Sequence, residues 1–206
     1  MKNLTVIEHP LLARALTRLR DQSTPPQAFR HHLQECGRLL ACEATRFLDS
    51  RPVRVRTPLA LASGVELKRP VTLVPVLRAG LALLDPFREL LPEASIGFVG
   101  QRRDEATLHP ETYLFKVPDV KKADVFVLDP MLATGGSAVS TMDLLRKHGA
   151  RRIRLVCLLA SPEGVECVTR AYPDVPILTA ALDRRLNDRG YIVPGLGDAG
   201  DRFFGT

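Results

Sequence analysis

Apolar residues recur along this chain in short continuous runs, and several of these runs are followed by a stretch with helical spacing. Residues 71–76, 125–128 and 153–160 are runs of this kind. A run that is apolar at nearly every position is typical of a parallel strand buried on both faces. Strands that alternate with helices predict an α/β fold with a central, mostly parallel twisted sheet, right-handed crossovers and flanking helices.

The same patterns predict the other elements and their approximate bounds. Helices are expected at 11–19, from a cap at Thr24 to Asp49, and at 81–90, 137–148 and 162–172. Strands are expected at 4–7, 54–59, 65–67, 71–76, 95–99, 113–117, 125–128, 153–160 and 175–180, with a hairpin turn at Ser63 and Gly64. Residues 187–206 contain five glycines and almost no periodicity, which predicts no regular structure.

The clearest candidate chemistry follows the strand at 125–128. Asp129 comes directly after the strand, and Thr134, Gly135, Gly136 and Ser137 precede the helix. Free backbone N–H groups, two hydroxyls and the positive end of the helix dipole would attract a phosphate, and Asp129 could accept hydrogen bonds from sugar hydroxyls. The expected ligand is a ribose 5-phosphate. The loop has neither the P-loop nor the dinucleotide spacing, and an ordinary turn capped by Thr134 or Ser137 is the alternative.

Three further segments suggest a site at the same edge of the sheet. Arg78, between a strand and the helix at 81–90, offers a second anion site, unless it is an ordinary surface arginine. Residues 100–112 are a charged excursion between two strands, which is either a solvated hairpin tip or a lid that excludes water. The apolar residues of 184–206 favour a hood over the sheet edge, with backbone groups facing a flat heterocycle, rather than a floppy tail.

Composition narrows the class of protein. The 206 residues, 45% of them hydrophobic, fit a single domain at 1–206. A net charge of +6 is compatible with nucleic acid, a membrane surface or a polyanionic substrate as the binding partner. The basic residues are dispersed and not interleaved with aromatic residues, which argues against binding of nucleic acid. No apolar run is long enough to span a bilayer, and Glu8 and Pro10 interrupt any signal peptide.

Cysteines and histidines indicate neither disulfides nor a metal site made by protein ligands. The four cysteines include no Cys-x-x-Cys pair, and the five histidines are scattered apart from the neighbours His31 and His32. We therefore expect a reduced, cytoplasmic protein.

A resemblance to a known family rests on the loop after residue 128. This loop resembles the phosphoribosyl diphosphate (PRPP) loop of the uracil branch of the type I phosphoribosyltransferases, in the residues Asp129, Pro130, Met131, Leu132, Ala133, Thr134, Gly135, Gly136 and Ser137. Similar segments lie at 8–11, 19–21, 43–46, 77–80 and 190–202. Family members often have an aromatic residue before the lid arginine, here Arg103. This chain has Arg102 there, which leaves open which arginine reaches the ligand.

The resemblance implies a glycosyltransferase that converts uracil and PRPP to uridine 5′-monophosphate (UMP) and diphosphate in pyrimidine salvage. Arg78, Arg103, Asp198 and the loop 129–137 would bind PRPP. The implied uracil contacts are Ile192, Gly197, Asp198 and Ala199. Asp198 and Arg103 would be the catalytic residues, and Mg²⁺ would be bound mainly through PRPP.

The resemblance also implies a homo-oligomer, either a dimer or a tetramer, and GTP as an allosteric effector. The single domain would comprise N-terminal helices at 1–50, a flexible lid at 100–112 and a uracil-binding hood at 184–206. Two rivals remain. One is an RNA-binding regulator of pyrimidine genes with the same fold, which the basic charge would favour. The other is an enzyme of the same class for another base, such as orotate or a purine. The carboxylate of orotate would need a cation, which the segment 192–199 does not offer, and Arg202 is the nearest candidate.

Overall fold

The computed structural model describes residues 3–103 and 110–206, except for the side chains of Arg103 and Pro110. The strands are β1 (Leu4–Val6), β2 (Ser50–Arg56), β3 (Leu61–Leu67), β4 (Val71–Leu77), β5 (Ser95–Ile96), β6 (Phe98–Arg103), β7 (Pro110–Lys116), β8 (Asp124–Leu128), β9 (Met131–Leu132), β10 (Arg152–Ala160), β11 (Ile177–Leu182), β12 (Arg185–Leu186) and β13 (Ile192–Val193). The helices are α1 (Pro10–Arg20), α2 (Pro26–Thr45), α3 (Leu81–Leu90), α4 (Gly136–Lys147), α5 (Pro162–Ala171) and α6 (Ala199–Phe204).

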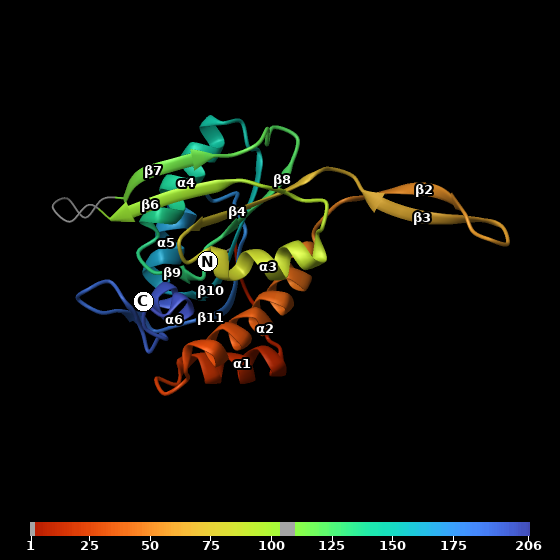
Figure 1. Cartoon of the computed structure of the whole chain (residues 1–206). Coiled ribbons are helices and arrows are strands. Elements are labelled where there is room, and N and C mark those ends of the chain that lie inside the picture. Colours follow the sequence, from red (N-terminus) through yellow and green to blue (C-terminus); the bar gives the residue numbers. More distant parts are fainter. Residues whose placement is uncertain (1–2, 104–109) are drawn as a thin grey trace.

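A nine-stranded sheet forms the centre of the protein. Its main path runs β1-β11-β10-β8-β4-β6-β7, while β5 pairs with β4 and β9 pairs with β10 (Figure 1). Every pair in this sheet is parallel except β6 with β7. The sheet therefore confirms the predicted α/β fold with a mostly parallel centre.

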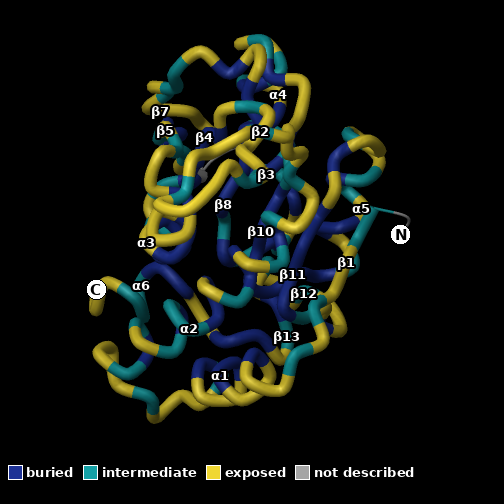
Figure 2. The backbone as a smooth tube through the Cα atoms, turned by 90° about the vertical axis from the view of Figure 1, so that its right-hand side faces the viewer, coloured by how far each residue is buried: buried dark blue, intermediate teal, exposed yellow. Residues whose placement is uncertain are grey.

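Helices cover both faces of this sheet. All five residues of β8 are buried, and successive side chains of a strand point to opposite faces. Phe126 and Leu128 belong to the hydrophobic core under α1, α2 and α3, whereas Val125 and Val127 belong to the core under α4 and α5. Figure 2 shows the central strands β8 and β10 as mostly buried. Within the described ranges, no helix has the length and apolar content that crossing a membrane requires.

Strands β2 and β3 form a separate hairpin that projects from the body of the protein (Figure 1). The predicted hairpin is present, but the predicted turn at Ser63 and Gly64 is wrong, because both residues lie inside the ladder of β3. The turn is made at Thr57, whose Oγ1 accepts a hydrogen bond from the Ala60 N–H at 3.0 Å. Pro58 lies between them and fixes the backbone angle that the turn needs.

Both ends of α2 differ from the prediction. Thr24 is not its cap, because the Thr24 hydroxyl donates to the Arg18 carbonyl at 2.6 Å, and Pro25 occupies the N-cap position without a side-chain bond. In a helix capped by Thr24, Pro26 would be the second residue, and because it carries no N–H one of the two usual donors to a cap hydroxyl is missing. The helix also ends earlier than predicted, at Thr45, and the residues after it lead into β2.

Two other predictions of regular structure are corrected. The strand expected at 95–99 is two strands separated by Gly97, whose N–H bonds to the Leu73 carbonyl at 2.9 Å. The segment 187–206 is not devoid of regular structure, since it contains β13 and α6. Helix α6 has only six residues, too few for a helical period to appear in the sequence.

Candidate functional site

The carboxyl ends of β4, β8 and β10 meet at one edge of the sheet. Pro75 pairs with Leu128, and Leu128 pairs with Val156, so the loops after β4 and β8 start side by side. A cavity of about 260 Å³ at this edge is lined by Ala79, Met131, Ala133, Arg189, Gly190, Tyr191, Ile192, Gly197, Asp198, Ala199 and Gly200. The structure therefore brings together the Arg78 loop, the Asp129 loop and the hood, as expected of a ligand site in an open α/β sheet.

The first half of the Asp129 loop is fixed by backbone hydrogen bonds to β10. The Pro130 carbonyl accepts from the Leu159 N–H at 3.0 Å, and the Leu132 carbonyl accepts from the Ser161 N–H at 2.9 Å. Pro130 and Leu132 are buried. Pro130 and Leu132 therefore anchor the loop to the end of β10. The PRPP contacts expected of Pro130, Met131 and Leu132 stay predictions.

Gly135 shapes the second half of the loop. Its φ of +83° lies in the left-handed region, which glycine adopts without a steric penalty. A Cβ atom at this position would lie 2.8 Å from the Cβ of Cys167 and 2.9 Å from the carbonyl oxygen of Gly164, both on α5. Any larger residue would therefore displace the loop or α5.

Helix α4 begins without a side-chain cap. Its N-cap residue is Gly135, and the Val139 N–H bonds to the Gly135 carbonyl at 2.9 Å. The first N–H groups of the helix, including those of Gly136 and Ser137, thus have no partner within it. The alternative that Thr134 or Ser137 caps an ordinary turn is wrong, since neither side chain makes a cap bond and both are exposed. This helix start can accept an anion.

Asp129 lies half-buried at the end of β8. Its Oδ1 accepts a hydrogen bond from the Met131 N–H at 3.3 Å. Burial raises the pKa of Asp129 to about 6 from an ordinary value of 3.8, and the bond from Met131 offsets only part of that effect. Hydroxyl donors would favour the ionised carboxylate, so the environment of Asp129 suits a ligand that carries them.

Arg78 lies in the loop after β4, where the Leu77–Arg78 peptide is cis. Its exposed side chain contacts the hood, because Nη2 donates to Asp201 Oδ1 at 3.2 Å and the guanidinium lies 5.9 Å from the centre of the Phe204 ring. An ion pair between two exposed groups is weak. An anionic ligand could therefore replace Asp201 as the partner of Arg78.

Strands β6 and β7 continue past the end of β4 at the same edge. Across this hairpin, Arg102 Nε donates to Glu111 Oε2 at 2.8 Å, and this bond raises the pKa of Arg102. Arg102 is thus engaged within the hairpin. The Arg103 side chain and residues 104–109 lie outside the described residues, so the lid at 100–112 and the role of Arg103 stay predictions.

The hood folds over the sheet edge through short elements, with β12 paired to β13 and α6 after them. Asp198 is the N-cap of α6, and its Oδ1 accepts a hydrogen bond from the Asp201 N–H at 2.9 Å. Ile192 and Ala199 are buried, whereas Gly197 and Asp198 are exposed. All four predicted uracil contacts line the cavity.

Sequence reasoning missed part of the cavity lining, above all Arg189 and Tyr191. Arg189 lies in the turn between β12 and β13, where the Asn187 side chain accepts from the N–H groups of Arg189 at 3.0 Å and Tyr191 at 2.9 Å. Asn187 and Asp188, with Gly190 two residues later, are residues typical of a turn, and they could have indicated this hairpin. The turn adds a cation to the cavity.

Among the described residues, one group of three side chains could hold a metal ion, on α2: His31, His32 and Glu35. Arg14 Nη2 lies 3.5 Å from Glu35 Oε1 and competes for that carboxylate. At the sheet edge, Asp129 and Asp198 are instead engaged separately by backbone N–H groups. Isolated carboxylates of this kind fit a Mg²⁺ ion that takes most of its ligands from phosphate oxygens and water.

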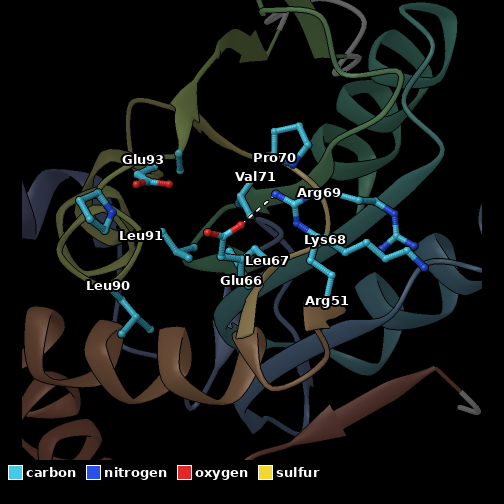
Figure 3. A pocket seen from close by; sticks show the side chains of 12 residues that line it. Arg51, Glu66, Leu67, Lys68, Arg69, Pro70, Val71, Leu90, Leu91 and Glu93 are labelled. Carbon is cyan, nitrogen blue, oxygen red and sulfur yellow. Dashed lines mark hydrogen bonds and ion pairs between the residues drawn. The ribbon is translucent and has the colours of Figure 1, made fainter. Parts of the chain in front are cut away.

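A cavity of about 610 Å³ lies away from these residues (Figure 3). It is lined at Pro70 and Val71, where β4 begins, and so lies at the opposite edge of the sheet. Arg51 and Glu66 in its wall form an ion pair of 2.8 Å. None of the predicted site residues lines this cavity, so its larger volume does not make it the better candidate.

Comparisons with known proteins bear on the family of this chain. A family model described as uracil phosphoribosyltransferase matches residues 6–206. A Paracoccus denitrificans protein named uracil phosphoribosyltransferase is 52% identical over 206 residues, which cover 99% of this chain and 98% of that protein.

Solved structures agree with the fold. A protein from Aquifex aeolicus has a TM-score of 0.93 at 36% identity, with 98% of this chain and 97% of that chain covered. A hypoxanthine phosphoribosyltransferase from Trypanosoma cruzi is 13% identical, with a TM-score of 0.51 over 76% of this chain and 75% of that one, and shows similarity of fold alone.

Proposed function

The chain belongs to the uracil phosphoribosyltransferase family and converts uracil and PRPP to UMP and diphosphate, and we propose how its sheet edge performs this reaction. The observation that carries the proposal is the cavity of about 260 Å³, because the Arg78 loop, the Asp129 loop and the hood all line it. The reaction handles three groups: a phosphorylated ribose, a diphosphate and a base. Each of the three segments suits one of them.

The Asp129 loop would hold the ribose 5-phosphate. The 5′-phosphate accepts hydrogen bonds from the open N–H groups at the start of α4 and from the hydroxyls of Thr134 and Ser137. Asp129 accepts hydrogen bonds from the ribose hydroxyls. The uncapped helix start and the half-buried carboxylate support this assignment. Fixing both ends of the sugar aligns the anomeric carbon with the base, which lowers the entropic part of the barrier.

The arginines would take up the charge of the leaving diphosphate. As the bond to the anomeric carbon breaks, negative charge grows on the diphosphate oxygens and positive charge grows on the ribose ring. Arg78 exchanges Asp201 for the diphosphate, and Arg103 approaches from the predicted lid. Cations held close to developing charge stabilise the transition state. Mg²⁺ bound chiefly by PRPP oxygens would supply further positive charge to the leaving group.

The hood would bind uracil through its backbone. One edge of uracil carries an N–H donor between two carbonyl acceptors, and the backbone groups around Ile192, Gly197 and Ala199 can pair with all three. Asp198 lies in the same wall of the cavity, and it is our candidate for accepting the proton that the attacking uracil nitrogen loses. The location of these four residues at one cavity supports the assignment.

The placement of two arginines bears on the choice of base. Arg202 is engaged by backbone carbonyls, since Nη1 donates to Leu19 at 2.5 Å and to Leu196 at 2.8 Å, and Nη2 donates to Asp21 at 2.7 Å. It therefore does not serve the carboxylate of orotate. Arg189 remains as a cation at the cavity, which makes orotate the most informative competing base.

The test follows nucleotide formation by the purified protein with PRPP and Mg²⁺, and with uracil, orotate, cytosine and guanine in parallel. We expect rapid product formation from uracil alone. An Arg189→Gln variant should keep this selectivity if the hood backbone reads the base. Comparable rates with orotate in the native protein, lost on Arg189→Gln, would contradict the uracil assignment of the hood.

We propose that the protein is a homo-oligomer in which the β2–β3 hairpin contacts a second copy. The hairpin projects from the body and exposes apolar side chains, of which Leu59 is 96% and Val65 is 72% exposed (Figure 1). Exposed apolar patches of this kind usually mark an interface. Sedimentation of the native chain and of a Leu59→Lys/Val65→Lys variant tests the proposal. A native monomer at micromolar concentration would contradict it.

GTP activation and a place in pyrimidine salvage follow from the family resemblance alone, and a cytoplasmic location from the absence of paired cysteines in the sequence. Initial rates with and without GTP at low PRPP concentration test the first of these. Neither the comparisons nor the described residues favour the RNA-binding regulator. The proposed function is therefore the enzyme alone.

A further inference from the structure

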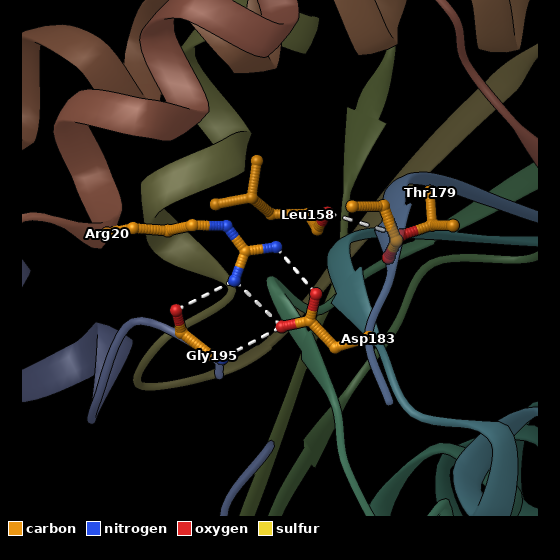
Figure 4. A network of polar contacts seen from close by, with 6 residues as sticks. Arg20, Leu158, Thr179, Asp183 and Gly195 are labelled. Carbon is orange, nitrogen blue, oxygen red and sulfur yellow. Dashed lines mark hydrogen bonds and ion pairs between the residues drawn. The ribbon is translucent and has the colours of Figure 1, made fainter. Parts of the chain in front are cut away.

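Two successive carbonyl groups in the hood accept hydrogen bonds from arginine side chains, one from the N-terminal part of the chain and one from the hood itself. Arg20, at the end of α1, donates from Nη1 to the Gly195 carbonyl at 2.9 Å. Asp183, just after β11, accepts at Oδ2 from the Gly195 N–H at 2.8 Å (Figure 4). Arg202 Nη1 donates to the Leu196 carbonyl at 2.8 Å. These three side chains are called the hood clamp below.

The core of the hood clamp is a bidentate ion pair. Arg20 Nη1 and Nη2 donate to the two carboxylate oxygens of Asp183 at 2.8 and 2.6 Å. The Asp183 side chain is 6% exposed and that of Arg20 is 26% exposed. Two parallel hydrogen bonds between planar groups fix orientation as well as distance, which a lysine could not reproduce. Removing one partner would leave the other charge buried and unpaired.

The clamped segment lies between the predicted uracil contacts Ile192 and Gly197. Its turn is tight, because Gly195 has a φ of +60° and a Cβ atom there would lie 2.1 Å from the Ile192 carbonyl oxygen. Arg20 and Asp183 do not line the cavity themselves. They can therefore act on a bound base only through the backbone that they hold.

If backbone groups of the hood recognise the base, its binding depends on where the peptide groups are held. A side chain can turn to follow a ligand, whereas a backbone N–H or C=O group moves only with its loop. Sites must be held within about 0.5 Å of the productive geometry by supporting contacts. In the hood, the described side-chain contacts that hold residues 195 and 196 include all three members of the clamp.

We propose that Arg20 and Asp183 are positioning residues for the base, which fix the backbone of the hood at the geometry that accepts uracil. The proposal rests on the assignment of the hood as the uracil site. It assigns to the C-terminal end of α1 a role in base binding, although Arg20 lies 175 residues from Gly195 in the sequence.

The experiment measures KM for uracil, KM for PRPP and kcat in Arg20→Lys and Asp183→Asn variants of the full chain. We expect KM for uracil to rise about 10- to 100-fold, as a misplacement near 1 Å would produce, and KM for PRPP to change less than about twofold. Arg38→Ala is the control, because Arg38 on α2 also makes a two-pronged ion pair, with Glu89 on α3, but at an exposed site.

A second variant separates positioning from stability. Arg20→Met/Asp183→Leu replaces the ion pair by apolar groups, and such replacements of a buried pair are often neutral or stabilising. We expect this variant to regain the melting temperature of the native protein but to keep the raised KM for uracil. If both the melting temperature and KM for uracil return to their native values in this variant, the proposal is overturned. It is also overturned if Arg20→Lys raises KM for uracil and KM for PRPP by the same factor.

Gly197→Ala distinguishes failure of this inference from failure of the proposed site. Gly197 has a φ of +82°, so alanine strains the backbone at the predicted uracil contact itself. If Gly197→Ala raises KM for uracil and the clamp variants do not, the clamp alone is refuted. If neither Gly197→Ala nor the clamp variants change KM for uracil, the hood is not the uracil site, and both the proposed site and the role of the clamp are refuted.

Discussion

The turns that lead into α4 and α5 differ in whether a side chain caps the helix. Strand β8 leads into α4 through Gly135, and no side chain caps the helix. Strand β10 leads into α5 through Ser161, whose Oγ accepts from the Gly164 N–H at 2.9 Å, while Glu163 adds negative charge to the first turn. The start of α5 is satisfied by the chain itself, whereas the start of α4 is left open to a ligand.

The two turns are also coupled. Ser161 Oγ donates to the Ala133 carbonyl at 2.6 Å, and the Ser161 N–H bonds to the Leu132 carbonyl at 2.9 Å. The capped turn thus supports the loop of the uncapped turn. A hydroxyl near a strand-to-helix turn can cap its own helix, as Ser161 does, or leave the helix start open, as Thr134 and Ser137 do. An open start alone does not mark an anion site, because α2 also lacks a side-chain cap; the start of α4 is distinguished by its place beside the cavity at the sheet edge.

The largest expected effect comes from Gly135→Ala, which distorts the open turn. The new Cβ meets Cys167 and Gly164, and the left-handed conformation is strained. Losing two charge-assisted hydrogen bonds to phosphate, at about 1.5–3 kcal/mol each, lowers kcat/KM for PRPP by about 10²- to 10⁴-fold.

Gly149→Ala is the control for that substitution. Gly149 follows the other end of α4 with a φ of +99°, and its new Cβ would meet the flexible side chain of Lys121 at 2.8 Å. We expect lower stability without a comparable loss in kcat/KM for PRPP. Equal losses in the two variants would mean that the α4 start has no special role.

The next effect is that of Asp129→Asn, which keeps the shape of the side chain but removes its charge. Hydrogen bonds from ribose hydroxyls to a charged acceptor are stronger than those to a neutral one by about 1–2 kcal/mol, so KM for PRPP should rise about 5- to 30-fold. Titration of PRPP into the protein without uracil measures the corresponding rise in the dissociation constant of PRPP. An unchanged affinity would remove Asp129 from the ribose site.

Asp129 also predicts a dependence on pH. Its pKa of about 6 in the folded protein exceeds the ordinary 3.8, so between these values the folded state binds the proton more tightly and the free energy of unfolding falls as pH rises. PRPP requires the ionised form, whose fraction falls about tenfold between pH 7 and pH 5. PRPP affinity should fall by that factor in addition to the titration of PRPP itself.

The Asp129→Asn variant supplies the baseline for the pH experiment, because only the titration of PRPP and of other groups remains in it. Affinity is measured from pH 5 to pH 8 in both proteins, and their ratio is compared. A ratio that stays constant over this range would show that Asp129 does not titrate near pH 6 in the ligand-free protein.

The smallest effect is expected of Ser161→Ala at the capped turn. Loss of the cap costs about 1 kcal/mol of stability, and loss of the bond to Ala133 costs about as much again. KM for PRPP should change by less than about tenfold, since the loop keeps its backbone bonds to β10. Thermal unfolding and steady-state kinetics check both quantities. A loss as large as that of Gly135→Ala would mean that the two turns form one functional unit.

Local sequence patterns were enough to predict the strand, loop and helix at 125–147 and the candidate chemistry within them. The reason is that these signals are local: an apolar run, an acid directly after it, two glycines and a helical period lie within one short segment. The same holds for β4 and for the helix after it, whose predicted positions the structure confirms.

The structure of the hood and the contacts that hold it depend on the rest of the fold. Short elements such as β9 and α6 show no period, and they exist because β10 and the rest of the fold support them. Contacts between Arg20, Asp183 and Gly195 join residues far apart in the sequence, and no local pattern indicates them. Backbone recognition leaves little trace in side-chain identity, because the groups that would bind the base are present in every residue and only the fold places them.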